Sequence, residues 1–143
     1  MQRQELTKLK KQLISEAKKE GFAEIRFTDS KVESKAFENL KKFLDVGLHG
    51  QMGWLQNNLD WRGDPKLMWH DVKSIIVLAE NYDLGIDPMK GLRFKNKANI
   101  SVYARGFDYH KIVKKRLKSV ASKLISISKG KTEVKVFVDT APV

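Results

Sequence analysis

The sequence predicts a protein of the α/β (α+β) class: a layered α/β/α domain with a mixed or antiparallel central sheet of about four strands flanked by helices. Three observations lead to this expectation. Apolar residues recur at intervals of three and four in three long segments, which is the helical period. Short apolar or alternating runs, typical of strands, separate and follow these segments. The length of 143 residues suffices for one core, so we expect residues 1–143 to form a single domain.

The first third of the chain predicts two helices and one strand. Residues 2–20 have an amphipathic pattern, and Gly21 is a natural end for this helix because glycine readily adopts the left-handed conformation. Alternating residues at 22–27 predict a strand. A second helix is expected at residues 33–46, and Gly47 ends it.

The middle of the chain is less regular. Residues 48–58 contain closely spaced glycines, which either allow the backbone to approach another surface or belong to a turn before a short helix that packs Trp54 and Leu55 into the core. An unbroken apolar run in residues 73–80 predicts a central strand that is buried on both faces. Glycine and proline within residues 82–96 predict a mobile, basic loop.

The last third predicts two strands on either side of the longest helix. The strands are expected at residues 98–103 and 133–138, and the helix at residues 108–128. Asp108 is the expected N-cap of this helix, because an aspartate side chain accepts hydrogen bonds from the backbone N–H groups of the first turn.

Composition excludes several classes of protein. The sequence has no cysteine, which excludes disulfides, zinc–thiolate sites and iron–sulfur ligation within this chain. The three histidines have no carboxylate or cysteine at ligand spacing, so we expect no protein-bound metal. No apolar run approaches the roughly 20 residues of a membrane span, and no secretory signal is visible. We therefore expect a cytoplasmic protein without a membrane partner.

The positive charge is concentrated in one segment. The chain has a net charge of +11, and residues 90–131 contain thirteen Lys and Arg residues and a single acid, Asp108. A segment of this charge attracts polyanions, of which RNA is the commonest. The alternative is that a lysine-rich protein simply carries a solvated basic helix.

Asp139 is the first candidate for chemistry. It follows an apolar strand-like run in the motif FVDTAP (residues 137–142), and sites of α/β proteins gather at strand ends. A carboxyl group in such a place can act as a general acid. The alternative is that Asp139 caps the next turn through Thr140, which is a common role for Asp followed by Thr.

A second candidate is the motif YARGFDYH at residues 103–110, between an expected strand and the longest helix. Arg105 could hold a phosphate, Tyr109 could stack on a base, and His110 could transfer a proton. Structural roles compete with each of these: Asp108 as a helix cap, Tyr109 in the core, and His110 on the surface.

These motifs also carry a family resemblance. Together with HGQMGWL (residues 49–55), RGDP (62–65) and SIIVLAENY (74–82), they make the chain similar to the N-terminal part of epoxyqueuosine reductases, from about residue 22 to residue 143. The order and spacing of five motifs make the resemblance specific. Members of this family are cobalamin-dependent, iron–sulfur enzymes that reduce epoxyqueuosine to queuosine at the tRNA wobble position, in queuosine biosynthesis.

The resemblance implies roles for individual residues. Asp139 matches the proposed proton donor of the family. The residues that match the cobalamin-binding and substrate cavity are Arg62, Tyr103, Arg105, Asp108, Tyr109 and His110. Phe107 departs from the family pattern, which usually has a polar or charged residue there, so no role is carried over to it.

The resemblance also implies partners. The family's 4Fe-4S clusters are held by cysteines of a ferredoxin-like C-terminal part, which continues beyond the equivalent of Val143, so we expect a truncated protein or a split subunit with a cysteine-rich partner chain. The expected substrate is the anticodon region of tRNA. Without that C-terminal part we expect no turnover. The alternatives are a non-catalytic RNA-binding or cofactor-binding module that retains the fold, or a relic without function.

Overall fold

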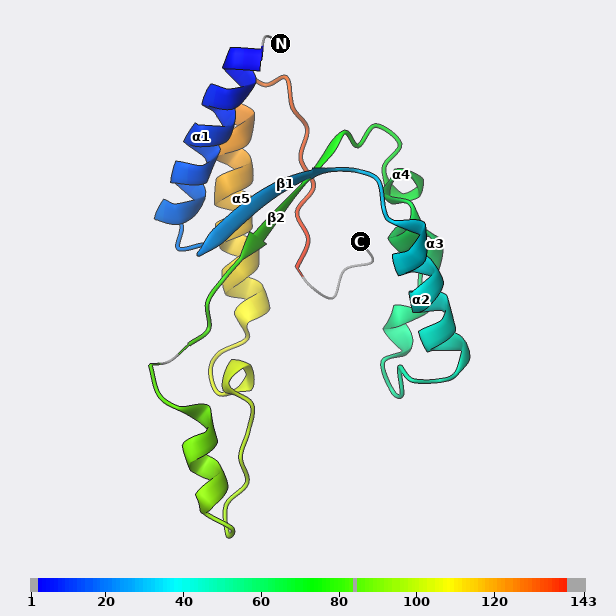
Figure 1. Cartoon of the computed structure of the whole chain (residues 1–143). Coiled ribbons are helices and arrows are strands. Elements are labelled where there is room, and N and C mark those ends of the chain that lie inside the picture. Colours follow the sequence, from blue (N-terminus) through cyan, green and yellow to red (C-terminus); the bar gives the residue numbers. More distant parts are fainter. Residues whose placement is uncertain (1–2, 84, 139–143) are drawn as a thin grey trace. The chain divides into compact units, whose positions relative to one another are not determined.

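The computed structural model describes residues 3–83 and 85–138 (Figure 1). The fold is α/β with about half of the chain helical, as the sequence predicts at this coarse level. The elements in chain order are α1 (Arg3–Lys19), β1 (Glu24–Asp29), α2 (Ser34–Asp45), η1 (Gly53–Leu55), α3 (Leu59–Gly63), α4 (Pro65–Met68), β2 (Ser74–Ala79), η2 (Pro88–Arg93), η3 (Val102–Ala104) and α5 (Tyr109–Ile127), where η marks a 3₁₀ helix. No helix of the described residues has the length and hydropathy that a membrane crossing requires.

The described chain forms two compact units. The first, the α1–α5 unit, comprises residues 3–25, 78–83 and 85–138, and the second, the α2–α4 unit, comprises residues 26–77. The single domain that we expect from the chain length stays a prediction.

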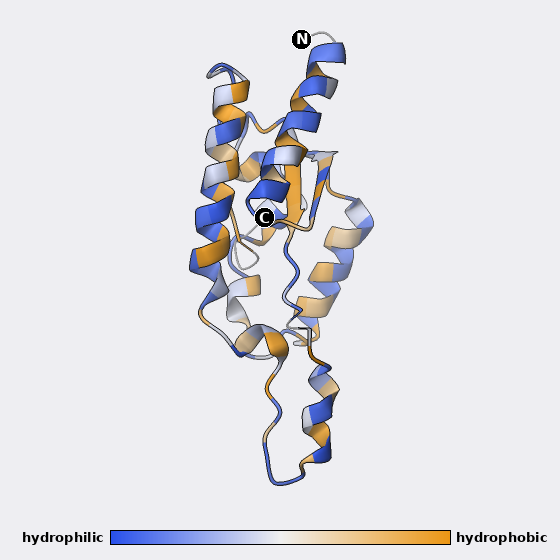
Figure 2. Ribbon diagram, turned by 90° about the vertical axis from the view of Figure 1, so that its left-hand side faces the viewer, coloured by the Kyte–Doolittle hydropathy of each residue, from blue (hydrophilic) through white to orange (hydrophobic). Residues whose placement is uncertain are grey.

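The core of the α1–α5 unit lies where α1 packs on α5. Leu13 and Ala17 of α1 are fully buried, and Val120 and Leu124 of α5 are nearly so. Each pair is four residues apart and therefore lies on one face of its helix. Both helices alternate between hydrophobic and hydrophilic patches along the ribbon (Figure 2). The amphipathic pattern of the sequence therefore determines which face of each helix is buried.

Gly21 ends α1 in the way the sequence predicts. Its φ of +97° lies in the left-handed region, where glycine is favoured. The N–H of Gly21 donates to the carbonyl of Lys18 at 3.0 Å, and the N–H of Phe22 donates to that of Ala17 at 3.1 Å, which is the Schellman arrangement. The chain then turns into β1, and Phe22 is buried in the core.

Polar contacts near Gly21 also tie α5 to the rest of its unit. The Ser119 hydroxyl donates to the Glu20 carboxylate at 2.6 Å. The Arg116 guanidinium pairs with Glu80, just after β2, and would lie 3.3 Å from a Cβ at Gly21. A side chain at this position would therefore crowd Arg116 and require an unfavourable backbone conformation.

The α2–α4 unit is a smaller helical assembly. α2 packs on α3, and α3 on α4. Gly63 permits the first contact, because a Cβ there would lie only 2.8 Å from the Phe37 ring. Leu44 is buried in α2. Asp64 accepts a hydrogen bond from the Lys66 N–H at 2.9 Å and so caps α4, which begins with proline.

The expected four-stranded sheet is wrong for the described residues. β1 and β2 form a two-stranded antiparallel sheet, and just before β1 the Ala23 N–H donates to the Ala79 carbonyl at 2.9 Å. Residues 98–103 contain the start of η3 instead of a strand, and residues 133–138 have no strand. The first difference has a physical reason: the Ile100 carbonyl, which a strand would pair with a neighbour, accepts a hydrogen bond from the Arg105 side chain.

Two further predictions need correction. β2 is not buried on both faces: Val77 is 54% exposed, because β1 is the one strand that pairs with β2 among the described residues. The loop expected at residues 82–96 contains the 3₁₀ helix η2, which Asp87 caps by accepting the Met89 N–H at 2.9 Å. One of the two alternatives for residues 48–58 is a short helix that packs Trp54 and Leu55 into the core; the helix is present as η1, but Trp54 is exposed.

The packing of α1 on α5 makes a stability prediction. Replacing Leu124 by Ala leaves a cavity in this core and should lower the free energy of unfolding by about 3 kcal/mol, measured by urea denaturation followed by far-UV circular dichroism. The matched control is Leu92→Ala, which removes the same atoms from an exposed side chain and should change stability by less than about 0.5 kcal/mol. Equal losses for the two variants would contradict this packing.

Candidate functional site

The polar junction before α5 brings four of the candidate residues into contact. Tyr103 lies in η3, Asp108 is the N-cap of α5, and Tyr109 and His110 occupy the first turn of the helix. The ring centroids of Tyr109 and His110 are 4.3 Å apart with an angle of 23°, so the rings are stacked. The Tyr103 ring meets the Tyr109 ring edge-on at 6.4 Å. We call these four residues the junction cluster.

One carboxylate oxygen of Asp108 holds the junction cluster to the helix. Asp108 Oδ1 accepts the backbone N–H of His110 at 3.0 Å and lies 2.9 Å from His110 Nδ1. A carboxylate can only accept, so Nδ1 carries the proton of this hydrogen bond. The neutral imidazole then has its lone pair on Nε2, the nitrogen that can accept a hydrogen bond or a proton.

The Asp108 carboxyl group is held in its charged form. The side-chain hydrogen bond from His110 lowers the pKa of Asp108 most, and the backbone N–H of His110 and the positive charge of Lys111 lower it further. Asp108 is therefore a carboxylate at neutral pH. This geometry suits it to orient His110 and excludes it as a proton donor at that pH.

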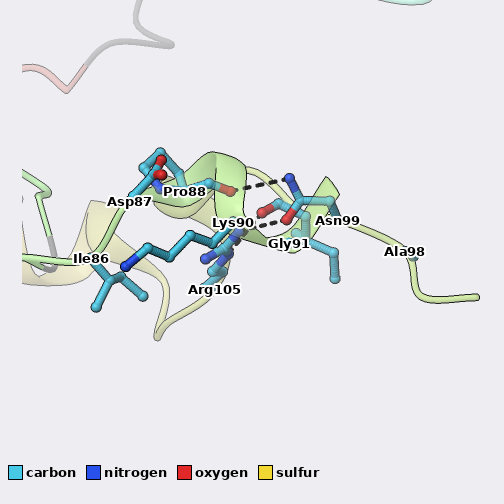
Figure 3. A pocket seen from close by; sticks show the side chains of 9 residues that line it. Ile86, Asp87, Pro88, Lys90, Gly91, Ala98, Asn99 and Arg105 are labelled. Carbon is cyan, nitrogen blue, oxygen red and sulfur yellow. Dashed lines mark hydrogen bonds between the residues drawn. The ribbon is translucent and has the colours of Figure 1, made fainter. Parts of the chain in front are cut away.

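Arg105, just after η3, contacts two residues that precede η3. Its Nε donates to the Ile100 carbonyl at 2.8 Å, and its Nη2 donates to Asn99 Oδ1 at 2.8 Å. Asn99 Nδ2 in turn donates to the Pro88 carbonyl at 3.3 Å (Figure 3). Gly91 leaves room for Asn99, because a Cβ at Gly91 would lie 2.6 Å from the amide oxygen. The guanidinium is thus fixed in place by two acceptors.

A surface pocket of about 510 Å³ lies beside Arg105. The residues that line it come from η2 and the two residues before it, from the segment between η2 and η3, and from Arg105 just after η3 (Figure 3). They are Ile86, Asp87, Pro88, Lys90, Gly91, Ala98, Asn99, Ile100 and Arg105. Two cations, Lys90 and Arg105, thus share a mainly apolar pocket with one carboxylate, Asp87.

The remaining candidates lie elsewhere. Arg62 belongs to α3 in the α2–α4 unit, where its guanidinium carbon lies 5.5 Å from the Trp54 ring centroid. Asp139 lies outside the described residues. The structure thus joins four of the seven candidates in the junction cluster, whereas Arg105, between Tyr103 and Asp108 in sequence, makes its side-chain hydrogen bonds to Asn99 and Ile100. Among the described residues, no three His, Asp or Glu side chains are grouped as a metal site.

Asn99 is a residue that the sequence analysis missed. The strand that the sequence predicts at residues 98–103 includes Asn99, although asparagine is disfavoured in strands. That mismatch was the available signal, because a polar amide in an otherwise apolar run often has a specific hydrogen-bonding role. Here the role is to connect Arg105 to η2.

Comparison with known proteins identifies the family. Residues 62–140 match the family model described as "Epoxyqueuosine reductase QueG, DUF1730". The chain belongs to the epoxyqueuosine reductase family. The matched segment begins at Arg62 and includes Asp139, so all seven candidate residues of this epoxyqueuosine reductase relative lie within it.

Longer relatives support the same assignment. The chain is 33% identical over 129 residues to the epoxyqueuosine reductase of Cellulophaga algicola, covering 90% of this chain and 40% of that protein. It is 35% identical over 124 residues to that of Cyclobacterium marinum, covering 86% and 37%. It is 31% identical over 146 residues to that of Shewanella oneidensis, covering 96% and 36%. The chain thus spans about two fifths of the length of these epoxyqueuosine reductases. No solved structure matches it.

The contacts of Asp108 predict a pH dependence. Because the pKa of Asp108 is lowered in the folded state, its contribution to stability is present above its ordinary pKa of 3.8 and is lost as the pH falls through the lower folded-state value. The carboxyl carbon of Asp108, followed by NMR, should therefore titrate below pH 3.8. In His110→Ala the midpoint should move towards 3.8.

Two controls separate the causes of this shift. Lys111→Gln should move the midpoint less than His110→Ala, because the charge of Lys111 is the weakest of the contributions. Asp108→Asn keeps a side chain that can cap α5 but cannot titrate, so it should remove this part of the acid sensitivity. An Asp108 midpoint at or above 3.8 in the unmodified chain would refute the contact with His110.

Proposed function

We propose that the chain is the N-terminal part of an epoxyqueuosine reductase, which reduces epoxyqueuosine to queuosine at the wobble position of tRNA. The observation that carries the proposal is the family match over residues 62–140, which contains every candidate site residue. The junction cluster supports it further, since successive contacts link four of these side chains: Tyr103 with Tyr109, Tyr109 with His110, and His110 with Asp108. We place the protein in the cytoplasm, where tRNA is modified.

The residues of this chain fit one wall of a cobalamin site. The rim of a corrin ring carries amide groups, which both donate and accept hydrogen bonds. Tyr103 is exposed, the His110 imidazole has a defined tautomer, and the guanidinium of Arg105 is fixed, so this donor set can meet such a rim. We propose that Arg62, Tyr103, Arg105, Asp108, Tyr109 and His110 bind this cofactor. Bound cobalamin would supply a strongly reducing cobalt centre.

Within this proposal, one residue of the chain donates a proton and another orients a histidine in the site. Reduction of an epoxide to an alkene takes up two electrons and two protons and releases water. We propose that Asp139 donates the proton to the epoxide oxygen as the C–O bond breaks. Asp108 holds the proton of His110 on Nδ1, which leaves Nε2 to accept a hydrogen bond within the site.

The iron–sulfur clusters of the proposed enzyme belong to a part outside this chain. The sequence has no cysteine, so 4Fe-4S clusters need a cysteine-rich C-terminal part or partner chain.

The basic segment of residues 90–131 provides a surface for the phosphates of the tRNA anticodon region. The same positive charge also favours the second candidate function, a non-catalytic RNA-binding module, because RNA binding by this segment does not require Asp139.

The proposal predicts cobalamin binding that depends on the partner. Anaerobic titration of cobalamin, followed by visible absorbance, should show tight binding and epoxyqueuosine reduction only when the cysteine-rich part is present, since this chain contributes one wall of the site. Tight binding that is the same with and without the partner would contradict a shared site. Absence of binding in both conditions would remove the cofactor from the proposal.

The proposal also predicts a specific effect of Asp139→Asn. In the assembled enzyme, kcat should fall at least about 100-fold, because a general acid contributes this much or more. Cobalamin affinity and RNA affinity should not change. The matched control is Asp71→Asn, which removes the same charge from an exposed position beside His70 and should leave kcat unchanged. Full activity of Asp139→Asn would exclude Asp139 as the proton donor.

A further inference from the structure

Residues 85–100 form a separate structural feature of the α1–α5 unit, which we call the arm. The arm consists of η2 and the segment that returns towards η3. Its ribbon extends beyond the N-terminal end of α5 in both views (Figures 1 and 2). Most of its side chains are exposed. The arm does not belong to the junction cluster.

The arm is strongly basic, and its cations are available. It carries Lys90, Arg93, Lys95 and Lys97 against a single acid, Asp87. Asp87 accepts the Met89 N–H as the cap of η2. Within residues 3–83 and 85–138, no carboxylate forms an ion pair with any of the four cations. The arm can therefore bind an anion without first breaking an ion pair.

An aromatic ring lies among these cations. Phe94 is 44% exposed, and its ring centroid is 4.9 Å from the guanidinium carbon of Arg93 and 5.3 Å from Lys97 Nζ. A turn in which the Lys97 N–H donates to the Phe94 carbonyl at 3.0 Å brings Lys97 back to the ring. Cation–π contacts at exposed sites are weak. Both cations can therefore leave the ring for an anion, which attracts them more strongly, while the ring keeps its place.

The arm is held in shape by hydrogen bonds within it and by one from Arg105. Asn99 on the returning segment donates to the Pro88 carbonyl in η2 and accepts from Arg105 (Figure 3). The Phe94 N–H donates to the Gly91 carbonyl at 3.1 Å. These contacts order η2 and the returning segment before any ligand binds, which lowers the entropy cost of binding.

We propose that the arm binds single-stranded RNA, with Phe94 stacking on an unpaired base and Arg93 and Lys97 contacting the phosphates beside it. An exposed aromatic ring between cations matches the two parts of a nucleotide, a flat base and an anionic phosphate. The base must be unpaired, because a paired base has its faces covered by stacking in the duplex. A protein partner fits less well, since interface centres are depleted in lysine.

This inference rests on the proposed function, which supplies RNA as the partner, and adds a contact outside the junction cluster. The test uses fluorescence anisotropy of the full chain with a labelled anticodon stem–loop RNA and a fully paired duplex of equal length. Phe94→Leu should raise the Kd for the stem–loop about tenfold and leave the Kd for the duplex unchanged. Phe94→Trp should retain or strengthen binding, since it keeps a stacking surface.

Matched controls isolate the ring and the charges. Phe107→Leu removes a ring that is 92% exposed but has no cation over it among the described residues, and it should not change the Kd. Arg93→Gln and Lys97→Gln should each reduce the slope of log K against log salt by about 0.7. Lys41→Gln, in α2, should leave the slope unchanged. Circular dichroism verifies that each variant is folded.

The outcomes distinguish this inference from the proposed function. If the unmodified chain binds the stem–loop and Phe94→Leu binds equally well, the inference is wrong and the proposed function stands. If arm variants keep RNA affinity but lose assembly with the cysteine-rich partner, the arm binds protein and the inference is also wrong. If the unmodified chain binds no RNA, the inference fails together with the RNA part of the proposed function, while cobalamin titration still tests the rest.

Discussion

The packing of α1 against α5 is the contact on which the candidate site depends. Leu13 and Ala17 meet the helix that carries Val120 and Leu124, and these four side chains are almost completely removed from water. Burial of this kind is the main source of helix stability in proteins, because the packing of an amphipathic face contributes more than helix propensity. The first turn of α5 carries Tyr109 and His110. The hydrophobic contact at one end of the helix thus supports the polar cluster at the other.

Local signals predicted the helices well. The period of three and four, Gly21 at the end of α1 and Asp108 at the start of α5 depend on the residues themselves and their near neighbours, so they can be read from the sequence. The N-cap in particular follows from side-chain chemistry alone: Asp108 accepts the His110 N–H as expected. The boundaries of α1, α2 and α5 agree with the expectation to within one or two residues.

The strands and the site were harder to predict because they depend on partners distant in sequence. A strand is stable only when another edge pairs with it, and an apolar run does not say whether that edge exists. Residues 98–103 also contain Asn99 and Ile100, whose polar groups are engaged by Arg105 instead of a neighbouring strand. The junction cluster could be predicted in part, since its four residues lie within eight positions. The contact of Arg62 with Trp54 could not.

The double role of one oxygen atom links helix fraying to histidine chemistry. Asp108 Oδ1 contacts both the amide of residue 110 and the ring of the same residue. Each time the first turn of α5 unwinds, the imidazole loses the acceptor that keeps its proton on Nδ1, and the other tautomer becomes accessible. The two events share a single equilibrium. Amide hydrogen exchange at residue 110 therefore also reports how much of the time the ring presents Nε2 as its acceptor.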